Sequence, residues 1–135
     1  MNEWFALIRR LIDIPSVTGA EGDLARELER WLAERGYTVT LQPVEGDRYN
    51  VWATLGDPRL VMCTHLDTVP PFIASSEDQE HIRGRGSCDA KGVMVSMLAA
   101  AERLRAAGYD RPFTELEKGV TEYVRDYLAT DDAYV

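Results

Sequence analysis

The chain of 135 residues is long enough for one domain with a modest core, and its 45% hydrophobic and 28% charged residues are those of an ordinary globular protein. A net charge of −8 argues against nucleic acid as a partner, because phosphate binding needs clustered lysine and arginine. No apolar run approaches the roughly 20 residues of a membrane span. Two cysteines, Cys63 and Cys88, do not make a disulfide framework, so we expect a reduced, cytoplasmic protein.

The first part of the chain predicts two amphipathic helices. The first is amphipathic, carries acidic residues and has no small-residue cleavage site, so we expect a helix and not a signal peptide, and Pro15 ends it. Thr18 and Glu21 have the spacing of a capping box for the second helix, and Gly36 is placed as its C-terminal stop. The apolar stripes of the two helices are Trp4, Leu7, Ile8, Leu11 and Ile12, and then Leu24, Leu28, Trp31 and Leu32.

Three strand-like runs follow, at residues 37–44, 49–55 and 59–65. The turns between them, "EGD" and "GDP", favour antiparallel neighbours. Residues 72–80 are polar and predict a surface loop, and residues 81–86 could form another short strand.

Two more helices are expected towards the end of the chain. The segment 91–107 is apolar almost all round at first, so we expect it to be buried, with Gly108 closing it. A capping box from Thr114 to Glu117 opens the last helix, whose stripe is Leu116, Val120, Tyr123, Val124, Tyr127 and Leu128. The order of elements predicts one α/β domain over residues 1–135, with a small mixed sheet flanked by about four helices.

The stretch "VMCTHLDTVPP" places polar groups at the end of an apolar run. His65 and Asp67 are two residues apart, so on a strand both side chains lie on one face. Each residue also has a purely structural interpretation: His65 as a partly buried residue closing a strand, and Asp67 as a turn residue. Together they could instead hold a metal and orient its ligand.

The stretch "GRGSCDAKG" places Asp89 just before the predicted buried helix. Asp89 could be a helix N-cap or a ligand, and Lys91 could simply be solvated. Because ligands of α/β enzymes lie at sheet edges, His65 and Asp89 could meet at one edge. An imidazole together with a carboxylate suits zinc or a similar divalent ion.

With about twenty residues between them, "THLDTVP" and "GRGSCDAKG" resemble the zinc aminoacylase and exopeptidase family, which includes acetylornithine deacetylase, succinyl-diaminopimelate desuccinylase and carboxypeptidase G. The resemblance covers residues 1–113. It implies that His65 is a ligand of one zinc, that Asp89 bridges two zincs, and that Asp67 orients the histidine. It also implies a cis peptide between Asp89 and Ala90. In that family two metals clamp a water and the scissile carbonyl, and a glutamate takes the proton of the water.

The later part of the chain departs from the family pattern. The Glu-Glu motif, the lid domain and the late metal histidine have no counterpart, which suggests an internal deletion near residues 113–115. Residues 114–135 resemble the C-terminal helix of the family, and Glu115 and Glu117 are expected to be first-turn acids. We expect His81 to be exposed and not a ligand. Cys63 and Cys88 are expected to be small buried residues, with a thiol ligand or nucleophile less favoured.

The resemblance implies a shortened metallohydrolase-type domain for amide bonds of N-acyl amino acids or small peptides. We expect weakly bound zinc, or cobalt or manganese, at His65 and Asp89, with Asp67 in a catalytic supporting role and weak or no turnover. A homodimer could bring further ligands together. The alternative is a non-catalytic remnant or an engineered scaffold that retains the fold.

Overall fold

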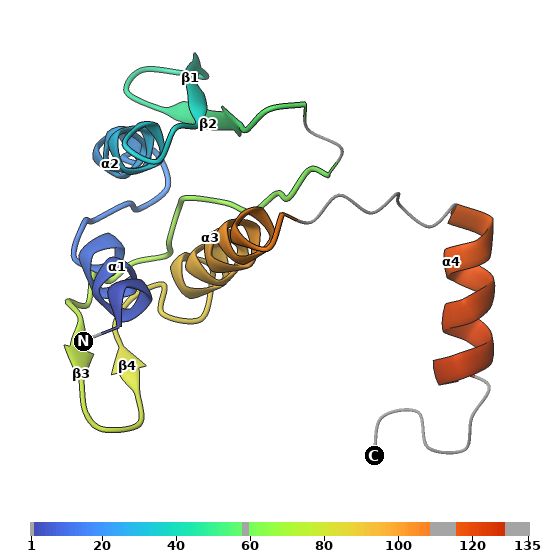
Figure 1. Cartoon of the computed structure of the whole chain (residues 1–135). Helices are drawn as coiled ribbons and strands as arrows, with labels where there is room; N and C mark the ends of the chain where they lie inside the picture. The colour runs from blue at the N-terminus through green and yellow to red at the C-terminus, as the bar shows by residue number, and fades with distance from the viewer. Residues whose placement is uncertain (1, 58–59, 109–115, 129–135) are drawn as a thin grey trace. The chain divides into compact units, whose positions relative to one another are not determined.

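The computed structural model describes residues 2–57, 60–108 and 116–128, and the chain divides into two compact units between Arg103 and Leu104. The elements follow one another along the chain as shown in Figure 1. They are α1 (Glu3–Ile12), α2 (Gly22–Ala33), β1 (Thr38–Pro43), β2 (Tyr49–Thr54), β3 (Ser76–Glu77), β4 (Ile82–Arg83), α3 (Lys91–Ala106), α4 (Leu116–Tyr123) and the π-helical turn η1 (Val124–Leu128).

The two N-terminal helices form where their apolar spacing predicts them. The side chain of Asn2 caps α1 by accepting a hydrogen bond from the Trp4 N–H at 3.1 Å. The predicted capping box of α2 is wrong. Glu21 is the N-cap residue and makes no side-chain cap bond to the helix, while the Thr18 hydroxyl donates to Asp67. Gly36 follows the end of α2 with a φ of +83°, as its role as a stop requires.

The strands lie in two antiparallel pairs, β1 with β2 and β3 with β4, where we expected one mixed sheet. The α/β class is confirmed. The predicted third strand is not formed over its described residues 60–65, and β3 lies within the segment predicted to be a loop. Leu60, Val61 and Met62 are 51%, 67% and 42% exposed. A strand needs a neighbour to pair with, and this apolar run has none among the described strands.

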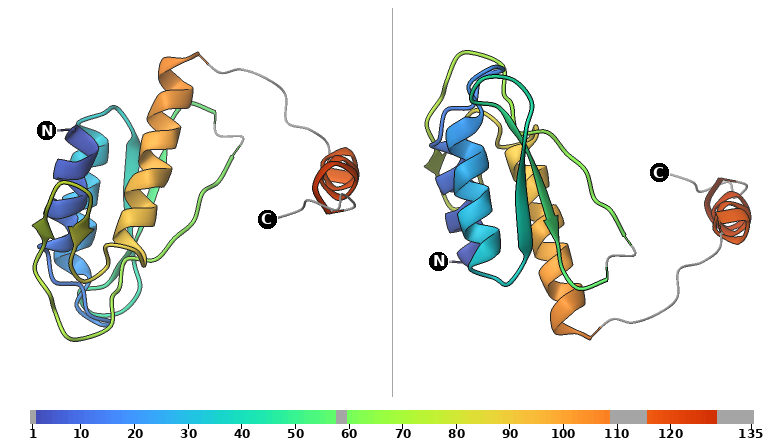
Figure 2. Two further views of the ribbon diagram at one scale, coloured as in Figure 1. Left: turned by 90° about the horizontal axis from the view of Figure 1, so that it is seen from below. Right: turned by 90° about the horizontal axis from the view of Figure 1, so that it is seen from above.

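The core of the first unit lies among α1, α2, α3 and the β1–β2 hairpin, which Figure 2 shows from two sides. Its buried members are Leu7, Leu11, Leu24, Leu28, Trp31, Leu32, Met94 and Val95. The helix α3 is less buried than its apolar sequence predicts, since Val93 is 48% exposed. One face of α3 packs on the core, and the other is not covered by the described residues of its unit.

The second unit contains the last three residues of α3, followed by α4 and η1. Here Val120, Tyr123 and Val124 of the predicted stripe are exposed. Thr114 and the proposed deletion point at residues 113–115 lie outside the described residues, so both stay predictions. None of the helices in the described part of the chain is long and apolar enough to cross a bilayer.

Candidate metal centre

His65 and Asp89 converge, as the sequence suggested. The Nε2 atom of His65 lies 2.9 Å from Oδ1 of Asp89, although the two residues are 24 positions apart in the chain. Half of the His65 side chain and 86% of the Asp89 side chain are exposed to solvent. The hydrogen bond to Asp89 is the main cause that raises the pKa of His65 above its ordinary value, with Asp67 adding to it.

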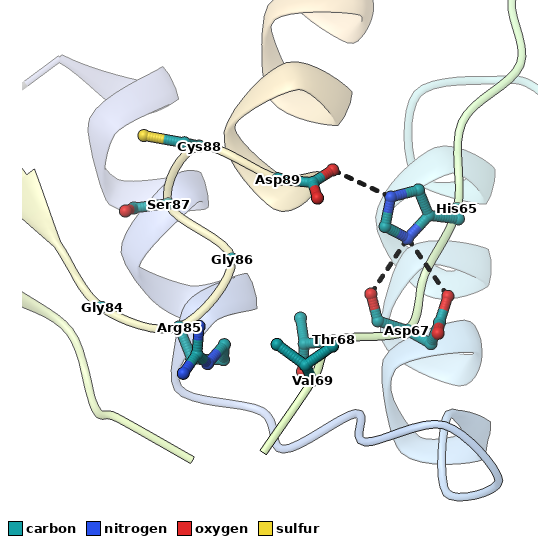
Figure 3. A pocket seen from close by; sticks show the side chains of 10 residues that line it. All are labelled: His65, Asp67, Thr68, Val69, Gly84, Arg85, Gly86, Ser87, Cys88 and Asp89. Carbon is teal, nitrogen blue, oxygen red and sulfur yellow. Dashed lines mark hydrogen bonds and ion pairs between the residues drawn. The ribbon is translucent and has the colours of Figure 1, made fainter. Parts of the chain in front are cut away.

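Asp67 lies on the other side of the His65 ring, as Figure 3 shows. The Nδ1 atom of His65 is 3.0 Å from the Asp67 backbone oxygen and 3.1 Å from Asp67 Oδ1. The other carboxylate oxygen of Asp67 accepts a hydrogen bond from the Thr18 hydroxyl at 2.7 Å. This bond is the main cause that lowers the pKa of Asp67 below its ordinary value. The ring therefore has a carboxylate at each nitrogen.

A short segment between α1 and α2 holds the His65–Asp67 segment in place. The Ser16 hydroxyl donates to the Leu66 carbonyl at 2.9 Å, and the Thr68 N–H donates to the Ser16 carbonyl at 2.8 Å. Val17 and Thr68 form a parallel β-bridge. Ser16 is fully buried. These bonds give residues 66–68 the fixed backbone that a neighbouring strand would otherwise provide.

The turn before α3 presents Asp89 to the histidine. Gly86 has a φ of +91°, and a Cβ there would lie 3.0 Å from the Lys91 side chain. A Cβ at Gly92 would lie 1.9 Å from the Ser87 carbonyl oxygen, so the turn folds back closely only because both positions are glycine. The Asp89–Ala90 peptide is cis, as the resemblance implied. The helix α3 begins only at Lys91, and the Asp89 carboxylate is directed to His65.

Lys91 is buried, and the interpretation of it as a solvated residue is wrong. The residue is 1% exposed, and its Nζ donates to the carbonyl oxygens of Leu11 at 2.9 Å and Ile14 at 2.6 Å. Burial lowers the pKa of Lys91 to about 8, against a smaller opposing effect of Asp13. Lys91 thus ties the start of α3 to the end of α1. No local pattern could have revealed this, since its partners lie 77 and 80 residues away.

The pair lines an open pocket of about 250 Å³. Arg85 lies across the pocket from His65 in Figure 3, and its Nε donates to the Pro71 carbonyl at 3.0 Å. The Cys88 sulfur points away from the His65 ring.

Cys63 and Cys88 are both free and exposed, so the expectation of buried cysteines is wrong. His81 is exposed as predicted and lies near Asp78.

The donor set fits part of a metal site. Two ligand atoms each about 2.0–2.1 Å from a tetrahedral zinc lie about 3.3 Å apart, so the observed 2.9 Å needs only a small movement. Asp67 on Nδ1 leaves Nε2 of the neutral ring available to a cation. A catalytic zinc normally has three protein ligands. Over residues 2–57, 60–108 and 116–128, no group of three or more His, Cys, Asp or Glu side chains could hold a metal ion.

Comparison with known proteins gives a family and a set of relatives. The family described as Peptidase family M20/M25/M40 matches residues 61–115, which include His65, Asp67 and Asp89. A probable carboxypeptidase of Emericella nidulans is 37% identical over 127 residues, covering 85% of this chain and 30% of the relative. A Peptidase M20 domain-containing protein of Schizosaccharomyces pombe is 37% identical over 109 residues, which cover 76% of this chain and 27% of the relative. The chain therefore spans less than a third of the length of these relatives.

Proposed function

Because this chain belongs to peptidase family M20/M25/M40, we propose that its His65–Asp89 pair contributes two ligands to a divalent-metal site for hydrolysis of amide bonds. The substrates we propose are N-acyl amino acids or small peptides, and zinc is the proposed ion, with cobalt or manganese able to replace it. The single observation that carries this proposal is the 2.9 Å approach of the two side chains across 24 residues of sequence.

Each residue has a distinct role in the proposed site. His65 would bind the ion through Nε2, and Asp89 through its exposed carboxylate. Asp67 would keep the proton of the neutral ring on Nδ1, which leaves Nε2 as a lone-pair donor. When bound, the ion would polarise an amide carbonyl and activate water. With two ligands in place of three and no general base assigned, we expect this chain alone to bind metal weakly and to turn over substrate slowly or not at all.

Metal binding is tested by thermal unfolding with and without Zn²⁺ or Co²⁺. Both cysteines are exposed, so the variants are made in a Cys63→Ser, Cys88→Ser background to remove thiolate binding. An ion at a hundredfold excess over its Kd stabilises the folded state by about 2.7 kcal/mol. We expect this gain in the background protein and in His81→Ala, the matched exposed histidine, but not in His65→Ala. No metal-dependent shift in the background protein would refute the proposed site.

A non-catalytic role is the second candidate, because the described residues provide only two donors in contact. In this case the chain would retain the fold without turnover. Hydrolysis of N-acetyl amino acids at saturating metal distinguishes the two. Turnover that His65→Ala abolishes favours the enzyme, and metal binding without turnover favours the non-catalytic chain. The cytoplasm remains our proposed location, which suits the two free thiols.

A further inference from the structure

Thr18 was expected to cap α2, but its hydroxyl is used elsewhere. It donates to Oδ2 of Asp67 at 2.7 Å, across 49 residues of sequence. Thr18 belongs to an exposed loop, whereas its neighbour Ser16 is fully buried and bonds to the backbone of the same segment. The backbone of residues 66–68 is therefore fixed by Ser16 and Val17, and the Thr18 hydroxyl is directed at a side chain.

We propose that Thr18 is a positioning residue that fixes the rotamer of Asp67, and through it the orientation and tautomer of the His65 ring. The inference deepens the proposed function, because the ring it orients is the proposed metal ligand. One carboxylate oxygen of Asp67 is bound by Thr18, and this directs the other towards His65 Nδ1 at 3.1 Å. A hydrogen-bonded chain thus runs from Thr18 through Asp67 and His65 to Asp89.

The geometry explains why the ring needs this support. In the neutral ring one nitrogen carries the proton, and acceptors are present on both sides: Asp67 at Nδ1 and Asp89 at Nε2. A proton on Nε2 blocks the lone pair that a metal needs. The Asp67 side chain is 35% exposed, so water can replace the charge stabilisation that the Thr18 hydroxyl supplies. Water does not hold the carboxylate in one orientation, as the Thr18 hydroxyl does. Loss of the hydroxyl then frees the carboxylate to turn away from Nδ1.

The test compares Thr18→Val, which keeps the shape and removes the donor, with Thr18→Ser, which keeps the donor. Ser16→Ala is the matched control for a general loosening of the same segment. The first readout is the tautomer of His65 from ring ¹⁵N shifts in the metal-free protein, at a pH where the ring is neutral. Only two histidines are present, and His81→Ala assigns the signals. The second readout is Co²⁺ affinity in the cysteine-free background.

We expect Thr18→Val to raise the fraction of neutral His65 rings that carry the proton on Nε2. We also expect it to weaken Co²⁺ binding by about tenfold, which is the low end of the loss seen when a hydrogen-bond partner of a metal ligand is removed. Thr18→Ser should match the parent protein in both readouts. A parental tautomer in Thr18→Val overturns the inference, as does an equal change in Ser16→Ala or in Thr18→Ser. If no variant binds Co²⁺ but the tautomer responds as stated, the positioning role stands and the proposed metal site fails.

Discussion

The buried amine of Lys91 makes the stability of the fold depend on pH in an unusual direction. The ordinary pKa of lysine is 10.5, and burial lowers that of Lys91 to about 8 in the folded chain. Between these values the unfolded chain binds more protons than the folded chain. The free energy of unfolding therefore rises with pH through this window, and the contribution is constant below about pH 8 and above about pH 10.5.

The two pKa values of Lys91 also set the size of the effect. At about 1.4 kcal/mol for each pH unit, their difference corresponds to about 3 kcal/mol of stability gained between pH 8 and 10.5. Because the residue is 1% exposed, solvent screening removes little of this. Lys91→Met abolishes the titration but removes the hydrogen bonds that the Lys91 amine donates to the Leu11 and Ile14 carbonyls. It should be less stable than the parent protein at high pH.

Urea unfolding of the parent protein and of Lys91→Met, from pH 7 to 11 and in reductant, measures the difference. Trp4 and Trp31, whose ring centroids are 6.0 Å apart, report the loss of the core by fluorescence. Other titrating groups are common to both proteins and cancel in the comparison. The free energy of unfolding of the parent protein should rise by about 3 kcal/mol relative to that of Lys91→Met as the pH increases. Parallel curves over the whole range would refute the account of Lys91 as a desolvated cation.

Two further predictions concern the packing and the charges of the first unit. Leu24→Ala should lower the free energy of unfolding by about 2–5 kcal/mol, since Leu24 is fully buried. Val44→Ala, at a 57% exposed site of the same unit, should change it by less than about 0.5 kcal/mol. Equal losses in urea unfolding would contradict the core assignment. Arg48→Met should cost about 1–3 kcal/mol, because it removes the two 3.0 Å bonds that Arg48 donates to buried Glu21. Arg26→Met, at an exposed pair with Asp47, should cost under about 1 kcal/mol. The reverse order would show that burial does not decide the value of these pairs.

Local patterns in the sequence predicted the elements that local contacts stabilise. The stripe from Leu7 to Ile12 and the stripe from Leu24 to Leu32 gave α1 and α2, and the turn near Gly46 joins β1 to β2. The third strand failed for the opposite reason. The run at Leu60–Met62 has strand composition, but a strand also depends on a neighbour, which composition does not reveal.

The approach of His65 to Asp89 was predicted by the pairing of two motifs and by the resemblance they carry. The supporting residues were not. The sequence neighbours of Thr18 predict a capping box and those of Lys91 predict a solvated surface, whereas both residues bond to distant parts of the chain. Their partners lie 49 and 80 residues away, and only the folded chain brings them together. Cys63 was expected to be buried because free cysteine usually behaves as a small buried residue, but it lies in the exposed run that forms no strand.

The long reach of Lys91 has a consequence for the order in which the molecule can assemble during its synthesis. The β1–β2 hairpin and the helices before it form their backbone hydrogen bonds between residues close in sequence, so they can form while the ribosome is still extending the chain. The hydrogen bond from Lys91 to the Leu11 carbonyl joins residues 80 positions apart. Until Lys91 has emerged, its amine is not available to the Leu11 and Ile14 carbonyls, and the start of α3 cannot be tied to the end of α1.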